Sequence, residues 1–154
     1  MLTGYTPCFR REAGSYGSDV RGLNRLHQFD KVEIVRIEEP SKSYEVLDEM
    51  VEHVKNLLLE LELPFRIVRL CGGDLGFTSA LTYDFEVYSM GQNKWLEVSS
   101  VSNFESFQSN RLNLKIDLGD KKKNYAHTLN GSSLALPRIV AVSYTHLRAH
   151  ETSI

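Results

Sequence analysis

The clearest periodic pattern in the chain lies between residues 43 and 61, where apolar residues recur every three or four positions. The apolar positions are Leu47, Met50, Val51, Val54, Leu57, Leu58 and Leu61. Charged residues fill the opposite side of this segment, as in an amphipathic helix that packs on a sheet. Pro40–Ser43 offers the helix N-cap, and Leu63-Pro64 ends the helix because proline lacks an amide hydrogen.

Segments with the alternating pattern of β-strands surround this helix. The predicted strands are Cys8–Glu12, Arg25–Arg36, Phe65–Cys71, Tyr83–Tyr88 and Lys94–Ser99, of which Phe65–Cys71 reads as a buried strand. A Gly/Ser-rich loop joins the first two into an antiparallel hairpin, and a four-residue turn joins the last two. The stretch His127–Ala141 is predicted to pass from a strand end through Gly131 into a helix. These elements predict an α+β fold, an antiparallel β-sheet flanked by helices.

Length and composition suit one ordinary domain. The chain has 154 residues, of which 42% are hydrophobic and 25% charged, with a formal net charge of −2. This balance provides no global basic field, so any RNA contact would have to be local. Cys8 and Cys71 give no disulfide framework, and neither a membrane-spanning run nor a signal-peptide pattern is found. We therefore expect reduced thiols, no membrane association and a cytoplasmic location.

The first hairpin carries the candidate chemistry. Alternate residues of a strand share one face, so Arg10 and Glu12 point the same way on the first strand. On the second strand the same parity groups Arg25, Phe29, Lys31 and Glu33. Guanidinium groups bind phosphate oxygens, an aromatic ring stacks on a base, and a carboxylate accepts from an amine or ammonium. The face therefore suits a nucleotide, and its alternative interpretation is a solvated sheet face with paired charges.

The literal residues resemble motif 2 of the class II aminoacyl-tRNA synthetases. The matching runs are TPCFRREAGS at residues 6–15, RGL at 21–23 and HQFDKVE at 27–33. They look most like the seryl-tRNA synthetase family. The similarity continues with EVSS at 97–100, followed by FQ at 107–108 and Arg111. It ends with Gly131-Ser132 and Pro137-Arg138, which resemble motif 3 of the class.

This resemblance implies ATP-dependent activation of L-serine to seryl-adenylate and transfer of the seryl group to tRNA(Ser). Arg10 and Arg138 are the implied catalytic residues; Arg10 would contact the α-phosphate, and Arg138 the outer phosphates together with Arg25. Phe29 would stack under adenine. The implied ATP-binding set is Arg10, Arg11, Glu12, Arg25, Leu26, Phe29, Glu97, Val98, Ser99, Ser100 and Arg138.

The resemblance also implies sites for the amino acid and for a metal ion. Glu33 would bind the ammonium group of serine, with Asn130 and Ser132 near its side chain. Glu97 and Ser100 would hold the Mg²⁺ ion that accompanies ATP, a sensible use of hard oxygen ligands beside phosphates. The loop of residues 14–22 would face the acceptor end of the tRNA.

The resemblance covers residues 1–141, which we interpret as part of a catalytic domain running from motif 2 to motif 3. In this family a helical tRNA-binding arm, motif 1 at a homodimer interface and a further serine-binding segment precede motif 2. We therefore expect a sheet truncated at both ends and a chain that is inactive alone. Residues 142–154 depart from the family pattern and look like a translated sequencing-adapter read, so we expect a non-native tail.

Two other interpretations remain at this point. A synthetase-like paralogue could activate an amino acid for an acceptor other than tRNA, or act as a non-catalytic regulator. A plain nucleic-acid-binding sheet could instead stack bases on Phe29, Trp95 and the tyrosines. The acidic balance of the chain and the carboxylates on the proposed binding face argue against this last interpretation.

Overall fold

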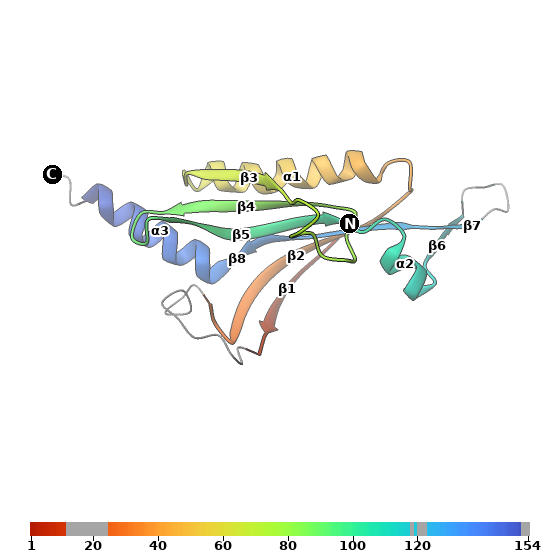
Figure 1. The fold of residues 1–154 in the computed structure, drawn as a ribbon, viewed down its shortest axis with the longest axis horizontal. Helices are drawn as coiled ribbons and strands as arrows, with labels where there is room; N and C mark the ends of the chain where they lie inside the picture. The colour runs from red at the N-terminus through yellow and green to blue at the C-terminus, as the bar shows by residue number, and fades with distance from the viewer. Residues whose placement is uncertain (12–24, 118, 120–122, 152–154) are drawn as a thin grey trace.

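The computed structural model describes residues 1–11, 25–117, 119 and 123–151, and in it helix α1 (Ser43–Glu60) lies over a sheet of antiparallel strands (Figure 1). Six strands form the main sheet in the order β1-β2-β8-β5-β4-β3, and every neighbouring pair is antiparallel. The strands are β1 (Leu2–Phe9), β2 (Gln28–Glu38), β8 (His127–Ala135), β5 (Lys94–Asn103), β4 (Leu81–Ser89) and β3 (Phe65–Arg69). The remaining elements are the ribbon β6 (Lys115–Asp117) and β7 (Lys123–Tyr125), and the helices α1 (Ser43–Glu60), α2 (Phe107–Leu112) and α3 (Leu136–Glu151). The predicted α+β class is confirmed, and so is antiparallel pairing in both predicted hairpins. The predicted bounds of the first strand, Cys8–Glu12, were wrong, because β1 ends at Phe9 and neither Arg10 nor Arg11 lies in a strand.

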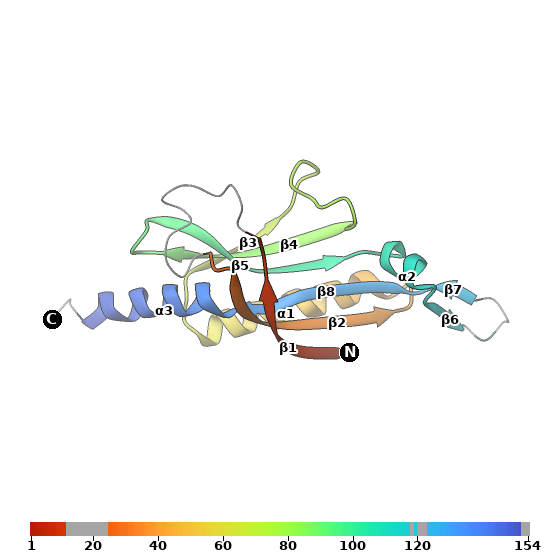
Figure 2. The ribbon, with the colours of Figure 1, turned by 90° about the horizontal axis from the view of Figure 1, so that it is seen from below.

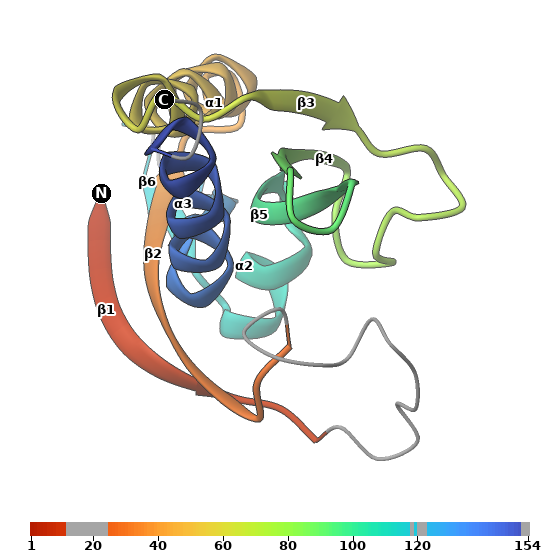
Figure 3. The same cartoon turned by 90° about the vertical axis from the view of Figure 1, so that its left-hand side faces the viewer.

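One face of the sheet is apolar and carries the core. Helices α1 and α3 pack there, and their buried residues join those of the strands in one cluster. The largest fully buried side chains of this cluster are Phe85, Leu47, Leu58 and Leu129. Figure 3 shows α1 and α3 on one side of the sheet and the short helix α2 on the other. The periodic apolar face of α1 thus covers the sheet as the sequence predicted, because burial of that face stabilises the helix.

The beginning of α1 lies within the predicted N-cap stretch Pro40–Ser43. Lys42 is the N-cap residue, and no side chain caps the helix there. Ser43 is instead fully buried, where its hydroxyl lies 2.8 Å from Nδ1 of His127 and accepts a hydrogen bond from Nδ2 of Asn103 at 3.1 Å. The serine therefore ties the start of the helix to β8 and β5. At the other end, Leu61 lies past the helix and is exposed.

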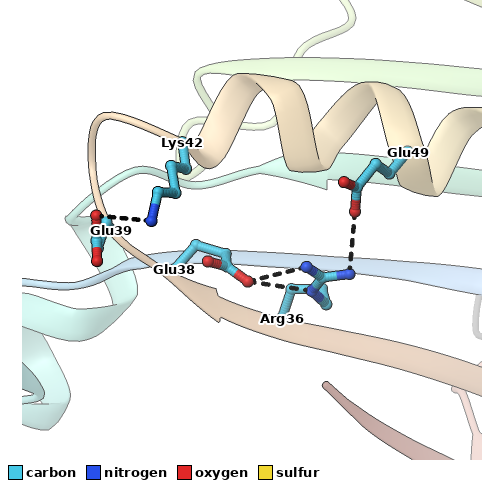
Figure 4. Close-up of polar contacts among 5 residues, drawn as sticks. All are labelled: Arg36, Glu38, Glu39, Lys42 and Glu49. Carbon is cyan, nitrogen blue, oxygen red and sulfur yellow. Dashed lines mark hydrogen bonds and ion pairs between the residues drawn. The ribbon is translucent and has the colours of Figure 1, made fainter.

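A group of partly exposed ion pairs connects α1 to β2 (Figure 4). The guanidinium of Arg36 contacts the carboxylate of Glu38 at 2.9 Å and that of Glu49 on α1 at 3.3 Å. Lys42 pairs with Glu39 in the connection between the two elements, at 3.2 Å. Most of these side chains retain water contact, so each pair contributes about 0 to 1 kcal/mol of stability.

The end of the chain departs most from the predicted elements. The sequence predicted that the strand ends near Gly131, but β8 continues to Ala135 and α3 begins at Leu136. A β-carbon on Gly131 would lie 2.9 Å from Cγ2 of Val101 and 3.1 Å from the carbonyl oxygen of Ser100 on β5. Glycine here allows two strands to approach closely, so it marks a packing requirement rather than the end of the strand.

Helix α3 continues the direction of β8 at one end of the sheet, while the β6–β7 ribbon extends from the opposite end (Figure 2). The helix crosses the boundary predicted at residue 141 without a break, and Val142 is fully buried in the core. The assignment of residues 142–154 as a non-native tail stays a prediction.

Strand β3 is an edge strand, and the prediction that it is buried was wrong. In the described part of the chain it pairs with β4 alone. Arg66, Ile67 and Arg69 are exposed. The apolar residues of such a short segment cannot distinguish a central strand from an edge strand, because that choice depends on which distant strands pair beside it.

Candidate active site

A cavity of about 230 Å³ opens where the turn before β2 meets β5, β8 and the beginning of α3. Its walls come from Arg10, Arg25, Leu26, Phe29, Lys31, Glu97, Val98, Ser99, Ser132, Ala135, Pro137 and Arg138. These residues lie far apart in the sequence and are brought together by the pairing of β2 with β8 and of β8 with β5. The cavity therefore combines three cationic guanidiniums, an aromatic ring and a carboxylate.

Arg10 is held beside Phe29 by the backbone of the turn that leads into β2. Its amide donates to the carbonyl of His27 at 2.9 Å, and its Nε donates to the carbonyl of Leu26 at 2.8 Å. The guanidinium carbon lies 4.7 Å from the centre of the Phe29 ring. A fixed cation beside an aromatic face can bind a phosphate and a base of the same nucleotide.

Arg138 also lines the cavity and lies in the first turn of α3. Proline at position 137 suits this turn, where amide hydrogens have no partner within the helix. The guanidinium of Arg138 donates to the backbone carbonyl of Glu97 and lies 3.9 Å from the carboxylate of the same residue. These contacts connect the start of α3 to β5 at the wall of the cavity.

The electrostatic environment of Glu97 is unusual for a carboxylate on a strand. Partial loss of water contact at the cavity wall raises its pKa above the ordinary value, although the side chain remains 52% exposed; repulsion from Asp84 raises the pKa further, while Arg138 lowers it. Asp84 lies on the neighbouring strand as the register partner of Ser100, and burial raises its pKa as well. Its Oδ1 atom is buried without a hydrogen-bond partner. The two carboxylates thus form a locally negative position that a cation would stabilise.

Several polar contacts connect Glu33 to the residues that line the cavity. Ser132 is the register partner of Glu33, and its hydroxyl donates to the Glu33 carboxylate at 3.4 Å. Lys31 contacts the same carboxylate at 2.9 Å. The hydroxyl of Ser99 donates to the backbone carbonyl of Ser132. These contacts join the position of Glu33 to the cavity, of which Ser132 and Ser99 form part.

Most of the site residues predicted from the sequence lie in or beside this cavity. Nine of them line the cavity, namely Arg10, Arg25, Leu26, Phe29, Glu97, Val98, Ser99, Ser132 and Arg138. Glu33 and Ser100 adjoin it through Ser132 and Asp84, and Asn130 lies two residues before Ser132 on the same face of β8. Arg11 is exposed and does not line the cavity. Glu12 and residues 14–22 lie outside the described residues.

Four residues of this region were not among the predicted site residues. Lys31, Ala135 and Pro137 line the cavity, and Gln108 on α2 contacts the side chain of Asn130. The strand parity already placed Lys31 beside Phe29, so that residue could have been found from the sequence. The position of Gln108 depends on the packing of α2 against β8, and the sequence carries no signal for this contact.

Among the described residues, no three His, Cys, Asp or Glu side chains form a group that could hold a metal ion by themselves. The oxygens of Glu97 and Ser100 nevertheless fit Mg²⁺ in the company of a nucleotide. This ion keeps several waters and is bound in such sites by one or two carboxylates together with substrate phosphates.

The fold and this cavity define a nucleotide-dependent synthetase core, and comparison with known proteins agrees. The chain belongs to the family "tRNA synthetase class II core domain (G, H, P, S and T)", which matches residues 1–146. The particular relatives that it resembles are serine–tRNA ligases. It is 60% identical over 138 residues to the one from Salinibacter ruber, and 55% identical over 149 residues to the one from Bordetella petrii. These matches cover 89% and 96% of the chain but only 32% and 33% of those proteins, so the chain spans about a third of their length.

Two solved structures extend the comparison to three dimensions. A seryl-tRNA synthetase from Pyrococcus horikoshii complexed with ATP superposes with a TM-score of 0.86 and 42% identity, over 91% of this chain and 32% of that one. A cytoplasmic serine–tRNA ligase from Naegleria fowleri in complex with AMP gives 0.83 and 31%, over 92% and 35%. The resemblance to seryl-tRNA synthetases is therefore confirmed, and the comparisons do not favour the alternatives of a paralogue or regulator.

Proposed function

We propose that this chain is the nucleotide- and serine-binding part of a serine–tRNA ligase, which activates L-serine with ATP and transfers it to tRNA(Ser). The observation that carries the proposal is the convergence of Arg10, Arg138 and Phe29 on one cavity beside Glu97. The two solved structures that it resembles were determined with ATP and with AMP. A nucleotide in this cavity would have its phosphates within reach of the arginines that line it.

The chemistry requires positioning and charge neutralisation rather than a protein nucleophile. A carboxylate oxygen of serine attacks the α-phosphorus, the bond from that phosphorus to the bridging oxygen breaks, and pyrophosphate leaves. Arg10 would bind the α-phosphate, while Arg25 and Arg138 would neutralise the outer phosphates. Phe29 would hold adenine by stacking. Transfer then occurs when a hydroxyl of the terminal tRNA ribose attacks the acyl carbon and AMP leaves.

Magnesium would be bound by Glu97 and Ser100, with the phosphates of ATP completing its coordination. When bound, the ion would neutralise phosphate charge, and the raised pKa of Glu97 supports a cation at this position. On the amino-acid side, Glu33 would accept hydrogen bonds from the serine ammonium, and Ser132 and Asn130 would lie beside the bound serine. The hydrogen bond between Ser132 and Glu33 holds two of these groups together.

The cellular setting follows from the same proposal. None of the helices in the described part of the chain is long and apolar enough to cross a membrane. We infer a cytoplasmic enzyme that acts as a homodimer at the length of its relatives, and the similarity to the cytoplasmic ligase from Naegleria fowleri supports the location.

The test is serine-dependent exchange of labelled pyrophosphate into ATP. It is measured with this chain and with a hybrid in which the Salinibacter ruber ligase supplies the segments outside the matched region. We expect activity in the hybrid, and a loss of several orders of magnitude on Arg10→Ala, because a guanidinium that acts on the transferred group cannot be replaced by water. Arg69→Ala, on the exposed edge strand β3, is the matched control and should change nothing.

Two outcomes would contradict the proposal. Near-normal exchange by the folded Arg10→Ala hybrid would remove Arg10 from the reaction. A folded wild-type hybrid that binds ATP but exchanges no pyrophosphate with serine would overturn the ligase assignment. Exchange without charging of tRNA(Ser) would instead indicate a paralogue with another acceptor.

A further inference from the structure

Gln108 on α2 contacts the polar face of β8 at the edge of the proposed serine site. Its Oε1 atom accepts a hydrogen bond from the hydroxyl of Thr128 at 2.7 Å and from Nδ2 of Asn130 at 3.3 Å. The two partners lie two residues apart on β8, so both side chains occupy the same face of the strand. One oxygen atom thus links a buried threonine to a residue of the proposed site.

The buried threonine decides which end of the Gln108 amide faces β8. Thr128 is only 4% exposed, and among the described residues the side-chain hydrogen bond of its hydroxyl is the one to Gln108. If Gln108 presented its amide nitrogen, the hydroxyl would accept that bond and its own proton would remain buried and unpaired, which is costly. Thr128 therefore donates, and Gln108 presents its oxygen.

The orientation of the Gln108 side-chain amide determines that of the Asn130 side-chain amide. An oxygen of Gln108 attracts the amide nitrogen of Asn130 and repels its carbonyl oxygen. The side-chain amide of Asn130 consequently has its nitrogen toward α2 and its oxygen turned away from it. Without Gln108 the two ends of the Asn130 amide would exchange freely, because nothing else described in the structure distinguishes them.

We propose that Gln108 is a positioning residue that fixes Asn130 with its oxygen toward the amino-acid site, where this oxygen accepts a hydrogen bond from the substrate ammonium. The inference rests on the proposed function. An ammonium group is the ligand that suits the side-chain oxygen of Asn130, because an ammonium only donates hydrogen bonds and would be repelled by an amide nitrogen. The Glu33 carboxylate, linked to β8 through Ser132, provides a second acceptor on the same face.

The experiment uses two ligands that differ only in the ammonium group. They are the sulfamoyl analogue of seryl-adenylate and its des-amino counterpart, and their affinities are measured by calorimetry on the hybrid protein. We expect Gln108→Met to weaken the amino ligand roughly 10- to 100-fold, the size of one hydrogen bond to a charged group. The affinity of the des-amino ligand should remain within about twofold, because it lacks the group that the Asn130 oxygen binds.

Two further variants separate orientation from structure. Gln108→Glu keeps an acceptor for both partners and should retain most of the preference for the amino ligand. Thr128→Val keeps the shape of the side chain but removes the donor that fixes the glutamine, so part of the preference should be lost. Gln92→Met, in the exposed turn between β4 and β5, is the matched control and should leave both affinities unchanged.

The possible failures are distinguishable. If the wild-type hybrid binds neither ligand although it is folded, the proposed function fails and this inference fails with it. If the wild-type hybrid prefers the amino ligand and Gln108→Met keeps that preference, the role of Gln108 alone is overturned. An equal loss on both ligands would also overturn it, since that result indicates a general distortion of the site.

Discussion

Replacing Gly131 by alanine tests whether the close approach of β8 and β5 is what this residue provides. Gly131 is the register partner of Val101, and it stands between Asn130 and Ser132 on the strand that carries the proposed serine site. The added β-carbon would lie 2.9 Å from Cγ2 of Val101, which is nearer than side-chain carbons come in folded proteins. It would also lie 3.1 Å from Cα of Val101 and from the carbonyl oxygen of Ser100.

The expected cost follows from what could move. Val101 is fully buried, and its β-branched side chain is stiff about the first torsion. The other two close atoms belong to the backbone of the central strand β5, and they cannot move away without lengthening the hydrogen bonds between β5 and its neighbouring strands. Overpacking of this kind costs about 1–3 kcal/mol. Because rigid backbone atoms lie on one side of the new methyl group, we expect about 2 kcal/mol, or a fall in melting temperature of roughly 4–8 °C.

The assay is urea unfolding followed by tryptophan fluorescence, since Trp95 is the one tryptophan of the sequence and lies on β5, the strand that carries Val101. Gly72→Ala is the matched control: no atom lies within 4 Å of the β-carbon it would add. It should leave stability within about 0.5 kcal/mol of the wild type. A Gly131→Ala protein as stable as this control would refute the reasoning, because it would show that the two strands separate at no cost.

Three further predictions concern the core, the cavity and the surface. Val142→Ala should cost about 1–2 kcal/mol in urea unfolding, because Val142 is fully buried, whereas Val140→Ala, on the exposed side of α3, should cost almost nothing; equal effects would show that α3 does not pack as described. In metal-free protein the pKa of Glu97 is raised in the native state, so the native state takes up its proton at higher pH than the unfolded chain does. The free energy of unfolding should therefore rise as the pH falls from neutral through the raised pKa of Glu97, and Glu97→Gln should lack that rise; an identical pH dependence of the two proteins would contradict the shift. Glu49→Gln breaks the contact with Arg36 at 3.3 Å and should cost less than about 1 kcal/mol, with the difference vanishing in 1 M salt.

The sequence was most informative where a pattern is local. The apolar period of α1 and the alternation of β4 and β5 each depend on residues within about one element of each other, so they could be predicted directly. The first hairpin also followed from parity, which placed Phe29 and Lys31 on one face, and both line the cavity. The family resemblance added Arg138 and Glu97, which no periodicity would have singled out.

Long-range pairing was decided only by the tertiary structure. Strand β8 lies between β2 and β5, and this position brings Ser132 to Glu33 although 99 residues separate them. Small and polar residues of β8 lie on both faces of the strand, so its sequence shows no simple alternation of apolar and polar positions. The glycine in its middle therefore predicted a break, where the structure uses it for close packing.

The sequence by itself thus determined the class of fold, the amphipathic helix and most residues of the cavity. The tertiary structure decided which strands are central, that arginines from distant segments line one cavity, and that Gln108 contacts Asn130. The physical reason is that helices and hairpins are stabilised by contacts within a short stretch of chain. The order of strands and the orientation of a side-chain amide are set by partners that the local sequence does not specify.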